Sequence, residues 1–143
     1  MMKNRMRKVR ASRKNDQGAS LLEFGLVVLV FYTFVFGVMD FGRALYNYHF
    51  VSHAAREATR YAIVHGAASP APATAADIAA FIQGITPSSI DPHAITVSTT
   101  WSPNNEPGSD VRIQVQDNFH FIMPMLLTTQ MTMTSASQMV ISQ

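Results

Sequence analysis

The sequence predicts an α+β fold in which a long N-terminal helix packs on a small antiparallel sheet. An uncharged apolar run is followed by apolar residues at helical spacing, and no proline interrupts residues 19–64. The C-terminal half instead contains segments in which apolar and polar residues alternate, as they do in half-buried strands. At 143 residues, the chain is long enough for one domain and too short for two independent cores.

The charge of the chain is concentrated at its N-terminus. Seven of the eleven basic residues precede Gly18, in a segment with a single acid, Asp16, whereas the remainder carries four basic against eight acidic residues. We therefore interpret residues 1–18 as a basic cytoplasmic leader. No aromatic residues are interleaved with its charges, so we do not expect nucleic-acid binding. Cysteine is absent, which excludes disulfide and thiol chemistry.

An apolar run after the leader predicts one transmembrane helix. Between Ala19 and Met39 the only charged residue is Glu23, and about 20 helical residues cross a hydrocarbon core of roughly 30 Å. We assign the membrane helix to residues 19–41. The basic leader places the N-terminus in the cytoplasm by the positive-inside rule, so the remainder is extracytoplasmic.

Other interpretations of the apolar run compete with this one. A cleaved secretory signal would show a small-x-small site after its apolar core, and a transit peptide would be amphipathic. The residues that follow, MDFGRALYNYHF, contain no such cleavage site. An uncleaved signal anchor stays open as an alternative, but it leaves Glu23 unexplained.

Gly18 and Glu23 are explained together by a resemblance. A basic leader, a glycine, Ala-Ser-Leu-Leu-Glu-Phe and an apolar helix, in that order, resemble the prepilin signature of type IV pilins and pseudopilins. The resemblance implies that a membrane-embedded prepilin peptidase cuts after Gly18 on the cytoplasmic side. Ala19 would then be the new N-terminus and Glu23 the signature acid at the fifth mature position.

The chemistry of the cut gives Glu23 a reason to be there. Cleavage creates an α-ammonium at Ala19, one helical turn from the Glu23 carboxylate. An opposite charge lowers the cost of a carboxylate in lipid or in a packed bundle, and the ammonium of a neighbouring subunit is the partner that we expect. We interpret Glu23 as an assembly residue and not as a catalytic acid; an incidental interfacial acid is the alternative.

The stretch DFGRALYNYHFVSHAAREATRYA narrows the resemblance to the TadE-like branch of the pilin superfamily. Relatives show an acid-x-Gly-Arg turn after the membrane span and an Ala-Ala-Arg-Glu-Ala-x-Arg-Tyr-Ala run. The matching charged and glycine positions here are Asp40, Gly42, Arg43, Arg56, Glu57 and Arg60. Relatives often carry a proline inside the membrane helix, which this chain lacks, so a membrane kink stays open. Other pilins usually begin with phenylalanine where this chain has Ala19, so N-methylation also stays open.

Apolar residues at steps of three and four predict that the helix continues beyond the membrane as an amphipathic segment, residues 42–65. The predicted apolar stripe is Phe41, Ala44, Leu45, Tyr48, Val51, Ala55, Ala58, Ala62 and Ile63. Gly66 is the predicted stop. The whole helix, from about residue 19 to 65, would be roughly 70 Å long at 1.5 Å per residue, and its outer part needs a partner surface from the C-terminal segment.

Three residues of the outer helix, His49, His53 and Glu57, share a face and invite a metal hypothesis. They occupy three successive turns, so the end positions are about 12 Å apart and cannot meet at one ion. We expect instead a polar face beside Arg56 and Arg60, with Glu57 and Arg60 forming an ordinary helix pair. No metal site is predicted.

The linker between the first two predicted strands, SPNNEPGS, raises the same question for calcium. Asn104, Asn105, Glu106 and Asp110 fit no standard calcium loop, and Asn, Pro and Gly clusters are typical of turns. No nucleophile elbow, zinc motif or phosphate loop occurs in the chain. We therefore expect no enzymatic activity and no cofactor.

The C-terminal segment, residues 66–143, predicts a small extracytoplasmic α+β domain. A Pro-containing hinge at residues 66–73 leads to a short helix, TAADIAAFIQ, opened by a capping box of Thr74 and Asp77 and closed by Gly84. Period-two alternation predicts strands at residues 94–101, 110–119 and 131–142. The first two strands suit a hairpin, and a crossover containing Pro124 leads to the third.

The resemblance implies a structural role in the bacterial inner membrane: a minor pilin or pseudopilin of the tight-adherence (Flp-type) pilus system. Its implied partners are the prepilin peptidase, other pilins, a polytopic membrane platform and membrane lipid. Two alternatives stay open. One is a membrane-tethered extracytoplasmic binding module, whose helix any apolar helix could replace; the other is a pseudopilin of a type II secretion system.

Overall fold

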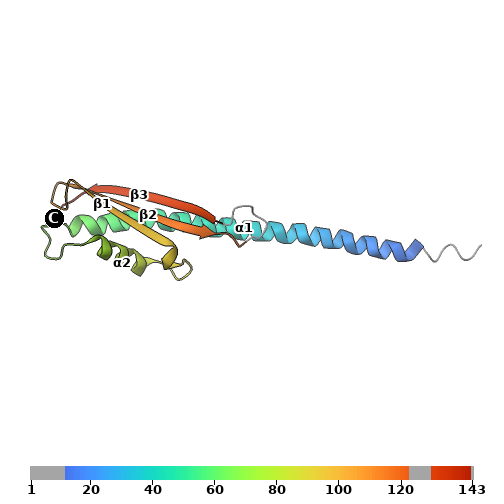
Figure 1. The fold of residues 1–143 in the computed structure, drawn as a ribbon. Coiled ribbons are helices and arrows are strands. Elements are labelled where there is room, and N and C mark those ends of the chain that lie inside the picture. The colour runs from blue at the N-terminus through green and yellow to red at the C-terminus, as the bar shows by residue number, and fades with distance from the viewer. Residues whose placement is uncertain (1–11, 123–129, 143) are drawn as a thin grey trace, which may run out of the picture. The chain divides into compact units, whose positions relative to one another are not determined.

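The structure, a computed structural model, describes the backbone of residues 12–122 and 130–142, with side chains from residue 18 onward in these ranges. The elements are α1 (Ser12–Val64), α2 (Ala75–Ile85), the 3-10 helix η1 (Pro92–Ala94), β1 (Ile95–Ser102), β2 (Asp110–His120) and β3 (Gln130–Val140) (Figure 1). The chain divides into two compact units, Met1–Met39 and Asp40–Gln143. In the second unit the C-terminal part of α1 packs on the sheet, which confirms the predicted α+β fold.

Helix α1 begins earlier than predicted. It starts at Ser12 and not at residue 19, because the residues between Ser12 and Gly18 include no proline or β-branched side chain that would oppose a helix. Its C-terminal end at Val64 lies one residue before the predicted end. There the His65 N–H donates to the Ala62 carbonyl at 3.2 Å, a tighter turn that closes the helix.

The buried face of the outer helix is only partly the predicted stripe. Its apolar part is fully inside the core: Val51, Ala54, Ala55, Ala58 and Ala62 are at most 2% exposed. The predicted members nearer the membrane segment, Phe41, Leu45 and Tyr48, are instead 70%, 47% and 55% exposed. The prediction is wrong there because the buried face continues through polar residues, Asp40 and Asn47, which a count of apolar residues passes over.

The sheet has the order β1-β2-β3, and both neighbouring pairs are antiparallel. The predicted strands are confirmed to within two residues at each end, and Val97 faces Val115 and Trp101 faces Val111 across the β1–β2 pair. The predicted crossover to the third strand is wrong, because β2 and β3 are direct antiparallel neighbours that a hairpin connection can join. Pro124, which we placed in that connection, lies outside the described residues.

Helix α2 opens with the predicted capping box. The Thr74 N–H donates to the Asp77 carboxylate at 2.8 Å, and the Asp77 N–H donates to the Thr74 hydroxyl at 3.3 Å. The backbone hydrogen bond from Thr74, followed by the one from its hydroxyl, lowers the pKa of Asp77 below the ordinary 3.8. The stabilisation by the ionised carboxylate is therefore complete above that value and is lost as the pH falls through the lowered pKa.

The predicted end of α2 at Gly84 is wrong, because the helix includes Gly84 and continues to Ile85. Thr86 ends it: its N–H donates to the Gln83 carbonyl at 3.2 Å and its hydroxyl donates to the Ile82 carbonyl at 2.7 Å. A side-chain hydroxyl therefore satisfies a terminal carbonyl here, and no glycine conformation is needed.

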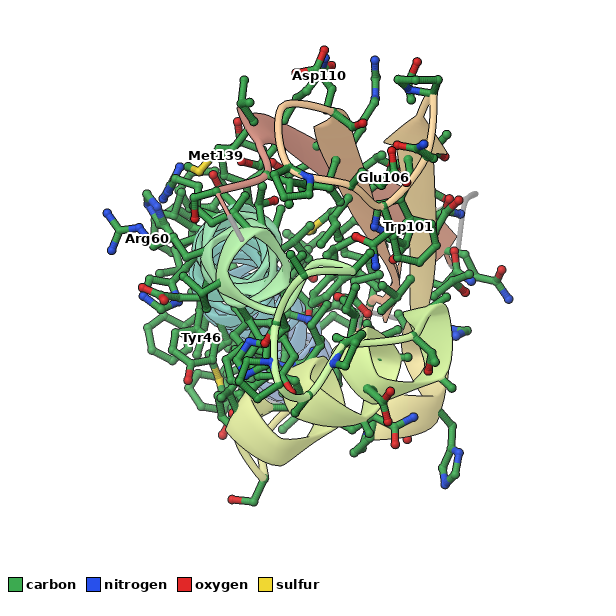
Figure 2. The ribbon with its side chains drawn as sticks, turned by 90° about the vertical axis from the view of Figure 1, so that its left-hand side faces the viewer. Tyr46, Arg60, Trp101, Glu106, Asp110 and Met139 are labelled. Atoms are coloured by element: carbon green, nitrogen blue, oxygen red, sulfur yellow. The ribbon has the colours of Figure 1, made fainter. Side chains whose placement is uncertain are left out.

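The core of the second unit lies between the alanine-rich face of α1, the inner face of β2 and helix α2. Its fully buried members include Ile78 and Ile82 from α2 and Val111, Ile113 and Val115 from β2. The rings of Tyr61 and Phe81 stack with centroids 4.7 Å apart. Figure 2 looks along α1 and shows the sheet and α2 on one side of the helix, while Arg60 and Tyr46 project from the other.

We expect Ala58→Leu to destabilise the second unit by about 1–3 kcal/mol, because the added atoms have no room in a packed core. Ala58 is 0% exposed and belongs to the helix–sheet core. Chemical unfolding of the full chain in detergent measures the change. Arg60→Leu is the matched control, because Arg60 lies on the open side of the same helix, and it should alter stability by no more than about 0.5 kcal/mol. Equal effects of the two substitutions would contradict the packing described here.

Candidate functional site

Residues 18–39 of α1 form an apolar helix without a partner in the described part of the chain. No residue in this range is buried, and large side chains such as Leu22 and Phe34 are 77% and 71% exposed. A helix that is apolar all round would expose this surface to water unless lipid or other helices covered it. By length and composition it can cross a membrane, which fits a single-pass membrane protein.

The predicted processing residues, Gly18 and Ala19, are exposed near the N-terminal end of α1. The structure places the Gly18–Ala19 bond inside α1, six residues after the start of the helix at Ser12. A peptidase that needs an extended substrate would therefore have to unwind the first turns. Glycine makes this unwinding easier, because it is about 1 kcal/mol less favourable than alanine in a helix.

Glu23, the predicted assembly residue, lies one turn beyond Ala19 on the exposed apolar helix. It forms no ion pair or hydrogen bond with any residue whose side chain the structure describes. The other polar side chain in the middle of the span behaves differently, since the Thr33 hydroxyl donates to the Leu29 carbonyl of its own helix at 2.8 Å. Glu23 is the one charged residue of the apolar run, and no described side chain compensates its charge.

Asp40 and Arg43, the acid and the arginine of the predicted turn motif, hold the end of β2 against α1. Asp40 is 3% exposed, and its two carboxylate oxygens accept from the Ile122 N–H at 3.1 and 3.0 Å. The Arg43 guanidinium donates to Asp40 at 3.0 Å and lies over the Phe119 ring, 5.1 Å from its centroid. We call this group of Asp40, Arg43, Phe119 and Ile122 the Asp40 clasp.

The clasp shows what the acid and the arginine of the acid-x-Gly-Arg motif do in the fold. A buried carboxylate is costly unless it is paired and hydrogen-bonded, and Asp40 has both a cation and a backbone donor. The contact joins residues 82 positions apart, so it fixes where the sheet ends along the helix. Gly42 is exposed, and a methyl group added to its Cα would meet no atom within 4 Å, so nothing in the structure explains the glycine there.

A second buried polar contact was missed by the sequence analysis. Asp117 is 1% exposed on the inner face of β2, and the Asn47 side-chain amide donates to its carboxylate at 2.8 Å. The signal was available, because Asp117 follows Val115 and precedes Phe119 on the apolar alternation of this strand. Asn47 and Asp117 extend the attachment of β2 to α1 beyond the clasp.

The Ala-Ala-Arg-Glu-Ala-x-Arg-Tyr-Ala run divides between two faces of α1. Its alanines lie in the core described above, whereas Arg56 and Arg60 are exposed. The Glu57 Oε1 atom lies 3.6 Å from Arg60 Nη1 and 3.8 Å from His53 Nε2. The predicted Glu57–Arg60 pair is therefore confirmed. The pair is solvent-accessible, so it contributes little to stability. In the described ranges, no three His, Cys, Asp or Glu side chains come together as metal ligands would.

The loop between β1 and β2 uses its polar side chains to close itself. The Asn104 side-chain oxygen accepts from the Glu106 N–H at 3.2 Å and from the Ser109 hydroxyl at 2.7 Å. Gly108 has a φ of 88°, a left-handed conformation that favours glycine. Asp110 accepts instead from Gln138 on β3 at 3.2 Å. The residues considered for calcium are therefore turn and strand residues, as predicted.

In the comparison with known protein families, residues 18–60 match the family described as TadE-like protein. The matched range contains Gly18, Glu23, Asp40 and Arg43. It also contains most of the Ala-Ala-Arg-Glu-Ala-x-Arg-Tyr-Ala run. It stops before α2 and the sheet. Searches of the curated proteins and of the solved structures found no significant match.

We expect Asp40→Ala to destabilise the second unit by about 1–3 kcal/mol, because it leaves the Ile122 N–H and Arg43 without their shared acceptor. Hydrogen exchange at the Ile122 amide should accelerate more than exchange elsewhere in β2. Asp110→Ala is the matched control at the other end of the same strand, where the aspartate has one hydrogen bond in an accessible position. If the Ile122 amide exchanged at the same rate in both variants, the clasp would not be holding the strand end.

Proposed function

We propose that this chain, whose residues 18–60 match the TadE-like family, is a minor pilin or pseudopilin of a tight-adherence (Flp-type) pilus or a related secretion apparatus. The observation that carries the proposal is the carboxylate of Glu23, which no described side chain pairs, on an apolar helical segment in which no residue is buried. A monomeric anchor gains nothing from such a residue, whereas a helix that packs beside identical or related helices gains a defined partner.

The proposed assembly step follows from the cut after Gly18. Hydrolysis of the Gly18–Ala19 bond adds water across the amide and leaves a carboxylate on the leader and an ammonium on Ala19. The ammonium lies about 6 Å along the helix from Glu23. A neighbouring helix shifted by this distance brings its own ammonium level with Glu23, and the two charges neutralise each other in a medium of low dielectric constant.

The open side of the outer helix supplies a second contact surface for neighbours. Arg60 and Tyr46 point away from the sheet in Figure 2. Glu57 is paired with Arg60, and Arg56 is exposed one helical turn before Arg60. Charges of both signs on one helix face favour a fixed orientation of the neighbouring subunit, because like charges placed opposite each other are penalised. The sheet and α2 leave this side of α1 uncovered within the second unit.

The proposed partners follow from these steps. A prepilin peptidase removes residues 1–18, a polytopic membrane platform receives the mature helix, and other pilins or pseudopilins pack beside it. Before assembly the chain resides in the bacterial inner membrane, with its N-terminus in the cytoplasm and the second unit outside. The role is structural and not catalytic.

We expect the membrane form of the protein to begin at Ala19. Intact-mass analysis of chain purified from membranes should show the loss of residues 1–18, because the peptidase cuts after Gly18. A Gly18→Val variant should keep the leader, since a β-branched side chain adds bulk beside the bond to be cut and restricts the backbone more than glycine does. Recovery of wild-type chain that still starts at Met1 or Met2 would refute processing.

We expect Glu23→Ala to be cut and inserted normally but to enter the fibre fraction at least about tenfold less, since a loss of about 1.4 kcal/mol already changes an equilibrium tenfold. Immunoblots of membrane and sheared-fibre fractions measure both steps. Thr33→Ala is the control within the span, because the Thr33 hydroxyl is satisfied by its own helix. Normal fibre content with Glu23→Ala would show that the helix is only a tether.

A further inference from the structure

Exposed apolar side chains gather at the end of the second unit that follows the apolar helix. Phe41 and Leu45 come from α1, Ile122 follows β2, and Met131 is near the start of β3. Their exposed fractions are 70%, 47%, 56% and 43%. We call these four residues the membrane-end rim.

The Asp40 clasp brings the members of the rim together. Asp40 is the chain neighbour of Phe41, and its carboxylate holds the Ile122 N–H at 3.0 Å. Met131 is paired in register with Phe119, the ring over which Arg43 lies. Leu45 is one helical turn beyond Phe41. Residues from α1, from β3 and from the segment after β2 therefore lie at the same end of the second unit.

Chain connectivity determines how near the rim is to the membrane. The apolar run ends at Met39, and Phe41 is two residues later, about 3 Å along the helix. This distance follows from the covalent chain and does not depend on how the two units are oriented. Ile122 is 82 residues from Asp40 in sequence, but its N–H is hydrogen-bonded to the Asp40 carboxylate. Ile122 therefore also lies near the end of the apolar run.

We propose that the membrane-end rim enters the interfacial layer of the bilayer on the extracytoplasmic side and holds the second unit against the membrane. Apolar side chains beside a membrane span gain free energy when they leave water and enter the boundary between the headgroups and the acyl chains. The buried Asp40 then has a purpose besides stability, because it aligns the tip of β2 with the membrane surface. The inference requires residues 19–39 to lie in a bilayer, and it does not require the pilus role.

The opposite end of the sheet offers a matched comparison. Val140 is 57% exposed, nearly the same as Ile122, and is paired with Asp110 at the far end of β2. With about 3.3 Å per residue along an eleven-residue strand, Val140 lies roughly 30 Å from the rim. An aliphatic side chain of equal exposure is therefore present at a site that the bilayer should not reach.

The chain contains no cysteine, so single cysteines can carry a nitroxide spin label without altering other residues. The full chain is labelled at Phe41→Cys, Ile122→Cys or Val140→Cys and placed, at low protein density, in vesicles of phosphatidylethanolamine and phosphatidylglycerol. Phe31→Cys, in the apolar run, is the lipid reference. Collisions with oxygen, which concentrates in lipid, and with a water-soluble nickel complex report the surroundings of each label.

The proposal predicts that the ratio of oxygen to nickel accessibility at positions 41 and 122 exceeds that at position 140 several-fold and approaches the value at position 31. Nickel accessibility at 41 and 122 equal to that at 140 would overturn the proposal, because the rim would then lie in water. Low accessibility to both reagents would also overturn it, since another protein copy would cover the rim.

Two further measurements keep the result decisive. If the label at 122 perturbs the clasp, as faster hydrogen exchange in β2 would reveal, Met131→Cys reports the same end from β3. If position 31 itself is accessible to nickel, residues 19–39 are not in lipid and the inference fails with its premise. Cleavage at Gly18 and fibre content are measured separately, so failure of the rim does not decide the proposed pilus role.

Discussion

The pairing of the Asp40 carboxylate with the Ile122 N–H and the Arg43 guanidinium is the contact on which the arrangement of the second unit depends. An ionised carboxylate that is 3% exposed would destabilise the fold if either kind of partner were missing. Both partners are present only when β2 ends at the first turn of the outer helix. This requirement positions the sheet along α1. The Asn47–Asp117 hydrogen bond attaches β2 to α1 at a second point, further from the membrane segment.

Asp40 and Glu23 differ in how their negative charges are compensated. Each is an acid in α1 whose negative charge is costly away from water unless a partner compensates it. Asp40 finds its compensation inside the chain and so becomes part of the fold. Glu23 finds none among the described side chains, and in the proposed function a neighbouring subunit supplies it. The location of the partner, inside or outside the chain, distinguishes a residue that stabilises the subunit from one that we assign to assembly.

The segment that matches the TadE-like family combines both kinds of residue on one helix. Its alanines let the sheet approach α1 closely, since a methyl group is the smallest side chain that still contributes apolar burial. The charged residues between them occupy the opposite face. Helical periodicity therefore allows a single run to build the core and present a surface, while the sheet and α2, outside the matched range, complete the core from the other side.

Local patterns in the sequence determined the parts of this structure that depend on local hydrogen bonds and on burial of one face. Residues 42–64 as a helix, the three strands and the Thr74–Asp77 capping box all follow from spacing alone. The TadE-like pattern also included Asp40, whose structural role the structure shows, whereas processing at Gly18 and the assembly role of Glu23 stay predictions.

Tertiary structure decided which polar residues are buried and which apolar residues are exposed. Asp40 and Asp117 lie inside because donors far away in the sequence, at Ile122 and Asn47, reach them. Phe41 lies outside because this polar contact occupies the inner face beside it. The free energy of burying a carboxylate depends on its hydrogen-bond partner. A distant backbone N–H is not part of the local apolar pattern, so helical periodicity does not predict this burial.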